Sequence, residues 1–277
     1  MGRLDGKVAV VTGSNRGIGR GIAMMFASEG AAVVVHGRTP DRGRGVVDEI
    51  VAAGGRAVSI TADVGEEASV EQLMAESART LGGIDILVNN AAPLDDVATA
   101  GNPIARSDTD KTEQILRIGL MGPYFAIKHA IPHMQARGGG SIVNISTTAT
   151  ITGLAGQPAY AMSKGGLNAL TISVAYDHGP DIRCNAIVLG MVNSGTGTRT
   201  PEFNADPAWQ AAQRAMHVTR AGEVDDVASI ATFLAADAGY ITGATIVADG
   251  GATIKTNMPV LPGRWYPDHA LPQVPLP

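Results

Sequence analysis

The sequence has almost no cysteine and lacks any long apolar or basic run. Its 277 residues include a single cysteine, so no internal disulfide can form, which fits a reducing compartment. No stretch approaches the roughly 20 apolar residues of a membrane-spanning helix, and the N-terminus shows no signal-peptide pattern. The 21 basic residues are mixed with 26 acidic ones, without the clustering that tracks a phosphate backbone. We therefore expect a cytoplasmic protein with neither nucleic acid nor membrane as a partner.

What the sequence does have is enough apolar material for a large core. Hydrophobic residues make up 45% of the chain, which excludes disorder for most of its length. Cys184 lies in a strand-like apolar run and is expected in the core. The 35 glycines lie between segments of periodic hydrophobicity rather than in a low-complexity run, so the composition predicts a globular protein.

Short apolar runs alternate with helical patterns along most of the chain. The expected strands are 8–11, 32–35, 57–60, 84–88, 141–145, 182–188 and 244–247, and the expected helices are 17–29, 41–53, 66–80, 109–137, 157–178 and 223–237. Strands joined by helix-length crossovers run parallel, and strands covered on both faces are continuously apolar. The pattern predicts an α/β fold with a doubly wound, seven-stranded parallel sheet and helices on both faces.

We predict one domain over residues 1–251, followed by a tail over 252–277. Within the domain, residues 190–220 are small and polar and are interpreted as a mobile flap over a ligand site. The tail holds six of the fifteen prolines, together with Trp265 and Tyr266. Two interpretations stay open: a frayed terminus, or a segment that docks its aromatics on its own or a neighbouring subunit.

A glycine-rich turn follows the first expected strand and opens the first expected helix. Glycines permit close approach of the backbone to a pyrophosphate, which the free N–H groups of the helix N-terminus then bind. The spacing also differs from a phosphate-binding loop that ends in Gly-Lys-Ser/Thr. We therefore predict dinucleotide binding by the turn, with contacts from Gly13, Ser14, Asn15, Arg16, Gly17, Ile18 and Gly19.

The residues after the second strand favour NADP(H) over NAD(H). A carboxylate at this place would bind the ribose hydroxyl of NAD, but the sequence has Gly37 and then Arg38. Arg16 could add a second guanidinium to the 2′-phosphate, although either arginine alone could be a surface charge. Asp63 and Val64 after the third strand are expected at the adenine, with a helix cap as the alternative for Asp63. Asn90 and Ala91 are expected beside the cofactor after the fourth strand.

A tyrosine and a lysine four residues apart predict an acid and base. Tyr160 and Lys164 lie on one face of an expected helix, and an adjacent ammonium lowers the pKa of a phenol. Carbonyl reduction by hydride requires such a proton donor. Tyr124 and Lys128 have the same spacing, but only Tyr160 follows, by thirteen residues, a hydroxyl cluster at the end of a strand. The cluster contains Ser146 and Thr147; we interpret Tyr124 as a packing residue.

Taken together, these motifs resemble the classical short-chain dehydrogenase/reductase family over about 250 residues. They are the segment from Thr12 to Gly19, Asp63, Asn89-Asn90-Ala91, Tyr160-x-x-x-Lys164, Arg183-x-Asn185-Ala186 and Asp249-Gly250-Gly251. The resemblance implies a Rossmann fold, hydride transfer between a nicotinamide and a carbonyl or alcohol, and Tyr160 as the acid/base. It implies that Lys164 binds the nicotinamide ribose, and that Gly190, Val192 and Ser194 contact the cofactor. It also implies a homo-oligomer, a tetramer rather than a dimer, that pairs helices 109–137 and 157–178.

The sequence departs from the family pattern at a few positions. Thr147 stands in place of a substrate-orienting serine, with Ser146 as a second candidate, and Ala92 and Leu189 replace a glycine and a proline. Ser194 replaces a threonine. Gly119 replaces an asparagine that usually holds a helix break and a relay water. Either an additional water fills the gap, so that Gly119→Asn changes turnover little, or the missing amide limits proton delivery.

The function predicted from the sequence is hydride transfer between NADP(H) and a carbonyl or alcohol, with no metal site. The alternative is a weak or inactive NADP(H)-binding homologue that serves as a sensor or assembly partner, which Gly119 and Ala92 suggest and Tyr160 and Lys164 argue against. The sequence does not identify the substrate.

Overall fold

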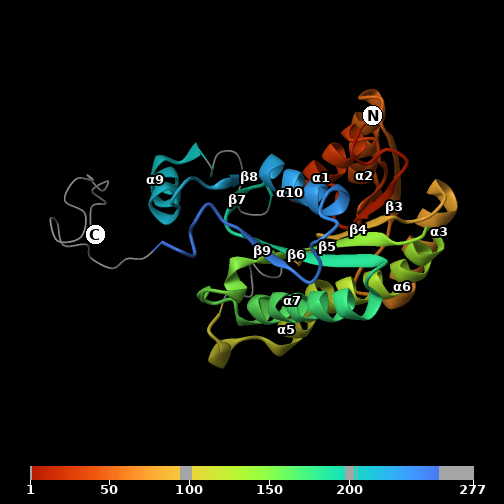
Figure 1. Cartoon of the computed structure of the whole chain (residues 1–277). Coiled ribbons are helices and arrows are strands. Elements are labelled where there is room, and N and C mark those ends of the chain that lie inside the picture. Colours follow the sequence, from red (N-terminus) through yellow and green to blue (C-terminus); the bar gives the residue numbers. More distant parts are fainter. Residues whose placement is uncertain (1, 94–101, 197–202, 204, 256–277) are drawn as a thin grey trace.

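A computed structural model describes residues 2–93, 102–196, 203 and 205–255. Seven parallel strands form the central sheet in the order β3-β2-β1-β4-β5-β6-β9 (Figure 1). They are β1 (Val8–Val11), β2 (Ala32–Gly37), β3 (Arg56–Thr61), β4 (Ile86–Asn89), β5 (Gly140–Thr147), β6 (Ile182–Leu189) and β9 (Thr245–Ala248). The order reverses between β1 and β4, which is where open α/β sheets bind their ligands.

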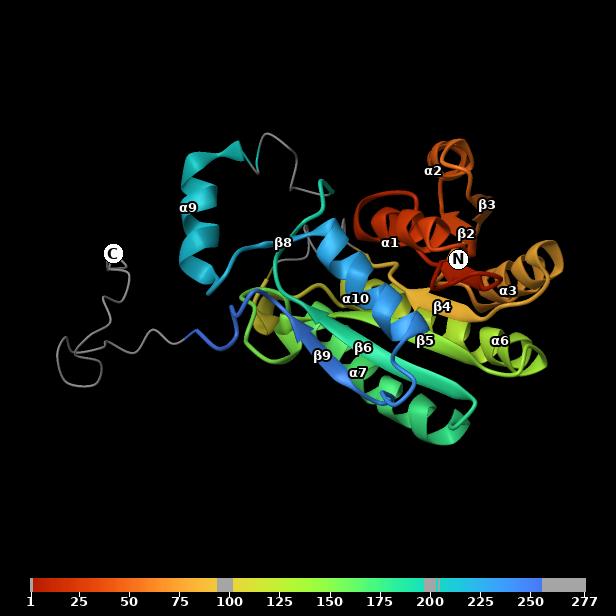
Figure 2. The same ribbon diagram turned by 45° about the horizontal axis from the view of Figure 1, so that its top comes forward.

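Helices cover both faces of this sheet (Figures 1 and 2). One face carries α1 (Gly17–Ser28), α2 (Pro40–Ala52) and α10 (Val224–Ala236). The other carries α3 (Glu67–Leu81), α6 (Gly122–Ala136) and α7 (Pro158–His178), with α5 (Thr109–Leu116) packed against α7. Two short 3-10 helices, η1 (Ile104–Arg106) and η3 (Thr148–Thr150), follow β4 and β5. The predicted doubly wound fold is confirmed.

The strands are continuously apolar because each face of the sheet has its own core. In β1, Ala9 and Val11 pack with Phe26 of α1, whereas Val8 and Val10 pack with Met74 of α3 on the opposite face. All of these residues are buried. Alternate side chains of a strand point to opposite faces, so a strand between two helical layers needs apolar residues at every position.

A buried polar ladder ties the centre of the sheet to α7. The Asn89 side chain donates to Asn144 at 2.8 Å, and Asn144 donates to the Thr171 hydroxyl at 2.9 Å. Thr171 donates in turn to the Leu167 carbonyl at 2.8 Å. Because buried polar groups are costly unless paired, this ladder fixes the position of α7 against β4 and β5.

The helix expected over 109–137 is interrupted. Between α5 and α6 the chain forms one π-helical segment, η2 (Arg117–Met121), which contains Gly119. Such segments occur mostly as single turns within α-helices and are frequent at functional sites. The prediction of one continuous α-helix is therefore wrong at this point. The apolar period continues through the segment, so the sequence does not reveal that one turn is wider than an α-helical turn.

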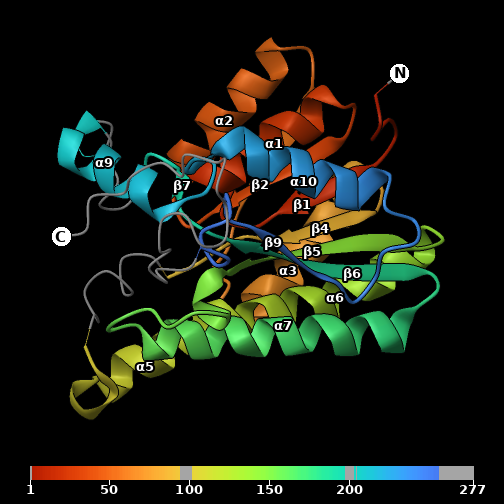
Figure 3. The same cartoon turned by 60° about the vertical axis from the view of Figure 1, so that its left-hand side comes forward.

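Residues 190–220 contain more structure than the predicted flap. A two-stranded parallel ribbon pairs β7 (Val192–Asn193) with β8 (Gly222–Glu223), and α9 (Pro207–Met216) lies outside the two helical layers (Figure 3). The Asp206 carboxylate caps α9 by accepting from the Trp209 N–H at 2.9 Å. Residues 197–202 and 204, and most of the predicted tail with Trp265 and Tyr266, lie outside the described residues. No described helix is long and apolar enough to cross a membrane.

Candidate active site

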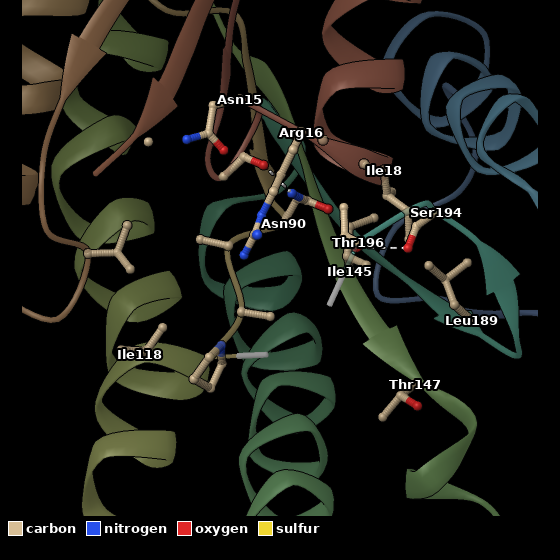
Figure 4. A pocket seen from close by; sticks show the side chains of 18 of the residues that line it. Asn15, Arg16, Ile18, Asn90, Ile118, Ile145, Thr147, Leu189, Ser194 and Thr196 are labelled. Carbon is tan, nitrogen blue, oxygen red and sulfur yellow. Dashed lines mark hydrogen bonds between the residues drawn. The ribbon is translucent and has the colours of Figure 1, made fainter. Parts of the chain in front are cut away.

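The carboxyl ends of the central strands open into a cavity of about 740 Å³. Its lining brings together nearly every residue predicted to bind cofactor or to catalyse. In chain order these are Gly13, Asn15, Arg16, Gly17, Ile18, Gly19, Arg38, Asp63, Val64, Asn90, Ala91, Ser146, Thr147, Tyr160, Lys164, Gly190, Val192 and Ser194. Figure 4 shows Asn15, Arg16 and Asn90 toward one end and Thr147 of β5 toward the other.

The glycine-rich turn is held against the end of β4 by a set of hydrogen bonds. The Thr12 hydroxyl accepts from the N–H groups of Asn90 at 3.0 Å and Ala91 at 3.1 Å. The Asn90 side chain donates to the carbonyls of Thr12 and Gly13. Gly13 has φ +65°, and a Cβ there would lie 2.9 Å from the Ala91 Cα. Glycine is therefore required both by the backbone conformation and by the close approach of the two loops.

The turn leads into the N-terminus of α1, where N–H groups remain available to an anion. The helix begins at Gly17, and its N-cap residue is Arg16 in extended conformation. An arginine side chain carries only donors, so it does not satisfy the free N–H groups of the first turn. Together with the positive end of the helix dipole, these groups suit a phosphate.

Ser14 differs from the other residues predicted to bind the cofactor. Its side chain is buried, donates to the Val11 carbonyl at 2.6 Å and accepts from the His36 N–H at 2.9 Å. It is not among the residues that line the cavity. The side chain therefore joins β1 to β2 in the interior, and the prediction that it contacts the cofactor does not fit this orientation.

Three arginines surround the end of the cavity near β2. Arg16 and Arg38 were expected there, and Arg42 of α2 joins them, together with Thr39. Arg42 was missed by sequence reasoning, although a cation in the first turn of the helix that follows β2 is a signal that could have found it. Three arginines in one cavity lining favour an anionic ligand such as a phosphate monoester.

Asp63 shapes the loop after β3 as well as lining the cavity. Its carboxylate accepts from the Gly65 N–H at 2.9 Å, and its own N–H donates to the Ser69 hydroxyl at 3.0 Å. The N-cap of α3 is Glu66, so Asp63 closes a turn rather than capping the helix. Of the two interpretations left open by the sequence, the helix cap is wrong.

The other end of the cavity contains the groups suited to proton transfer. Lys164 is 2% exposed, and its ammonium donates to the Ile145 carbonyl at 2.9 Å. Burial lowers the pKa of Lys164 to about 8 because the charged form loses its hydration. The Thr147 hydroxyl accepts from the Ala149 N–H at 3.3 Å, an arrangement that leaves its proton for a ligand. The buried Ser146 hydroxyl has no hydrogen-bond partner among the described residues.

The second tyrosine and lysine pair lies outside the cavity lining. Tyr124 is 44% exposed on α6 and meets the Phe125 ring edge-on, with centroids 6.0 Å apart. Lys128 forms an ion pair with Glu67 at 2.7 Å. Identical spacing in the sequence therefore places one pair in the cavity and the other on an exposed helix face.

The space beside Gly119 is already filled by a side chain. A Cβ on Gly119 would lie 2.9 Å from the Ser163 hydroxyl oxygen and 3.3 Å from the Ser163 Cβ. Ser163 is fully buried and donates to the Tyr160 carbonyl at 2.9 Å. The expectation that an added water occupies room left by the missing side chain therefore does not fit the structure, and Gly119→Asn is no longer expected to be neutral.

We expect Gly119→Asn to lower the free energy of unfolding by about 1–3 kcal/mol, because the new side chain overpacks against Ser163. Turnover should fall as well, since Ser163 lies between Tyr160 and Lys164 on α7. Urea unfolding of native protein, Gly119→Asn, Ser163→Ala and the double variant measures the coupling. Ser163→Ala should restore part of the loss; an Asn variant as stable as the native protein would contradict the packing argument.

Comparison with known proteins assigns the fold and the motifs to one family. A family model described as enoyl-(acyl carrier protein) reductase matches residues 13–253. A 7α-hydroxysteroid dehydrogenase from Clostridium sardiniense is 37% identical over 263 residues, covering 92% of this chain and 97% of the relative. A meso-2,3-butanediol dehydrogenase from Serratia marcescens is 34% identical over 261 residues, covering 93% and 98%.

Solved structures agree with the sequence comparisons. A short-chain type dehydrogenase/reductase from Mycobacterium ulcerans superposes with a TM-score of 0.81 at 26% identity, covering 91% of each chain. A dehydrogenase/reductase from Sinorhizobium meliloti superposes with a TM-score of 0.80 at 35% identity, covering 90% of this chain and 96% of that one. The similarity extends over nearly the whole length of each of these relatives.

Proposed function

Because the chain belongs to the short-chain dehydrogenase/reductase family of oxidoreductases, we propose that it transfers a hydride between NADP(H) and a carbonyl or alcohol, with Tyr160 as general acid and base. The observation that carries this proposal is the continuity of the cavity. One lining includes Arg16, Arg38 and Arg42 together with Tyr160 and Lys164. NADP carries its 2′-phosphate at one end and its reactive nicotinamide ring at the other. The cavity likewise has arginines toward one end and the proposed proton donor, Tyr160, toward the other.

The residues present fit such a cofactor. The turn at Gly13 and Gly17 forms a cradle that a Cβ would fill, since a Cβ on Gly17 would lie 2.7 Å from the Thr196 methyl. The N–H groups at the start of α1 suit the pyrophosphate, and the three arginines suit the 2′-phosphate. Lys164 would hold the nicotinamide ribose, with Gly190, Val192 and Ser194 near the ring.

The chain supplies the proton and the orientation. A bound nicotinamide would supply the hydride to the carbonyl carbon, or accept it in the reverse direction. Tyr160 gives its phenolic proton to the carbonyl oxygen during reduction and takes a proton from the alcohol during oxidation. Thr147 donates a hydrogen bond to the same oxygen, and the Lys164 ammonium stabilises the charge left on Tyr160.

The relatives' names indicate hydroxyl compounds of very different size, a hydroxysteroid and a butanediol. We therefore propose an alcohol or its carbonyl counterpart as the substrate class. Near Tyr160 the described lining includes Pro93, Leu154 and Gln157, which is a mostly apolar wall.

Two further proposals concern the assembly of the protein and its location in the cell. We propose a homotetramer that pairs α6 and α7, because α7 exposes Met162, Ile172 and Tyr176 on one face and such a stripe is costly in water. Light scattering on the full chain measures the assembly. We propose a cytoplasmic location.

The proposal is tested by NADPH oxidation, followed at 340 nm with a panel of ketones and aldehydes, beside a calorimetric titration of NADPH. We expect tight binding and turnover of at least one carbonyl compound. The alternative, a sensor or assembly partner with little activity, predicts tight binding without turnover of any compound. Tyr160 and Lys164 in the cavity favour the enzyme, because a sensor needs no proton donor there.

A further inference from the structure

A buried histidine connects the two walls of the cavity's nucleotide end. His36, in β2, is 2% exposed and lines the cavity. Its Nδ1 accepts from the Gly13 N–H at 3.0 Å, and its Nε2 is 3.1 Å from the Ala62 carbonyl oxygen. One imidazole ring thus bridges the glycine-rich turn and the start of the loop that carries Asp63 and Val64.

The two partners determine the protonation of the ring. A backbone N–H can only donate and a carbonyl can only accept, so Nδ1 must be unprotonated and Nε2 must carry the hydrogen. Burial lowers the pKa of His36 to about 4, against smaller opposing effects of the Ala62 carbonyl and the Asp63 carboxylate. The neutral tautomer that both bonds need therefore persists at neutral pH.

The backbone of His36 is tied to the same turn. Its N–H donates to the Ser14 hydroxyl at 2.9 Å, and its carbonyl accepts from the Ser14 N–H at 2.8 Å. The ring bond adds the first glycine of the turn, Gly13, which has φ +65°. Without an acceptor at Nδ1, the Gly13 N–H would lose its partner at a position where the backbone conformation is already unusual.

We propose that His36 is a positioning residue for the dinucleotide, and that its bond from Gly13 holds the glycine-rich turn in the conformation that receives the pyrophosphate. The hydrogen bond to the Ala62 carbonyl holds that turn at a fixed distance from the loop that carries Asp63. This proposal rests on the proposed function for the identity of the ligand. It assigns to His36 an effect on cofactor affinity but not on the chemical step, since Tyr160 and Lys164 lie at the other end of the cavity.

Two amide substitutions separate the two ring bonds. In His36→Asn the side-chain oxygen can stand near the place of Nδ1 and accept from Gly13, but it does not reach Ala62. In His36→Gln the amide nitrogen can stand near the place of Nε2 and donate to Ala62, but no acceptor remains for Gly13. His217→Gln is a matched control, because His217 is also buried and does not line the cavity.

We expect His36→Gln to weaken NADPH binding about tenfold in calorimetric titration, the effect of one lost hydrogen bond. His36→Asn keeps the bond from Gly13 and loses the one to Ala62, so it should weaken binding less than His36→Gln does. The control His217→Gln should stay within about threefold of the native affinity. In steady-state kinetics the loss should lie in KM for NADPH rather than in kcat, and KM should rise more in His36→Gln than in His36→Asn. Equal affinity of the two His36 variants would overturn the proposal. Failure of either variant to fold would also overturn it, because the ring would then be needed for the stability of the fold rather than for cofactor binding.

A second readout does not depend on the cofactor. In the free protein, the Gly13 amide should exchange with deuterium slowly in native protein and His36→Asn, and faster in His36→Gln. Unchanged exchange in His36→Gln would overturn the proposal even if NADPH binds. Absence of any NADPH or NADH binding by native protein would instead refute the proposed function, and the assignment of His36 to the cofactor with it, whatever the exchange shows.

Discussion

Replacing Tyr160 with phenylalanine should lower turnover by about 10²–10⁴-fold, the usual effect of losing a general acid. The substitution removes the phenolic proton but keeps the ring that lines the cavity. The calorimetric affinity for NADPH should therefore stay within about threefold of native, so that the loss is in kcat rather than in binding. Steady-state kinetics with any carbonyl compound that the native protein reduces, together with the titration, measure both effects.

The matched control is Tyr124→Phe, because Tyr124 has the same spacing to a lysine but lies on the exposed face of α6. Its turnover should be close to native. If Tyr124→Phe loses activity and Tyr160→Phe does not, the assignment of the proton donor is wrong. A Tyr160→Phe variant with native turnover would show that another group, such as Thr147 or a water, delivers the proton.

Removing two of the three arginines near β2 should reverse the proposed preference for NADPH. A hydrogen bond to a charged group contributes about 1.5–3 kcal/mol, so Arg38→Leu with Arg42→Leu should weaken NADPH binding by about 10²–10³-fold in this partly open site. Affinity for NADH should change less than about threefold, because NADH lacks the 2′-phosphate. Parallel titrations of the two cofactors measure the ratio.

The control for this pair is Arg44→Leu, which removes a cation from α2 that does not line the same cavity. Leucine at 38 and 42 is preferable to Gly37→Asp, since a Cβ on Gly37 would lie 2.3 Å from the Asn15 amide nitrogen and would disturb the turn itself. Equal use of NADPH and NADH by the native protein would contradict the proposed role of the arginines, as would an equal loss of affinity for both cofactors in the double variant.

The strands and helices that surround the site could be predicted from the sequence because their signals are local. β1 has the predicted bounds, and α7 differs from its predicted range by one residue. The helix α9 was missed because its segment is small and polar, although Asp206 followed by Pro207 is a start signal. The π-helical segment around Gly119 was missed because the apolar period of the helix continues on both sides of it.

The site residues also divide into those that belong to a local sequence motif and those that do not. The placement of Tyr160, Lys164 and the glycine-rich turn in one cavity could be predicted because their motifs lie within a few consecutive residues. Ser14 lies within that turn, yet its side chain points into the interior. His36 and Arg42 belong to no sequence motif. The role proposed for His36 depends on its contacts with Gly13 and Ala62, which are distant from it in the chain.

The sequence by itself determined the alternation of strands and helices, the nucleotide turn and the tyrosine and lysine pair. It did so because hydrophobic period and short-range spacing express forces that act between near neighbours in the chain. Only the tertiary structure decided that Arg42 and His36 line the same cavity as Arg16 and Arg38, and that Ser163 fills the space beside Gly119. These depend on how helices and strands pack, and packing brings together residues whose separation in the sequence carries no information about their distance in space.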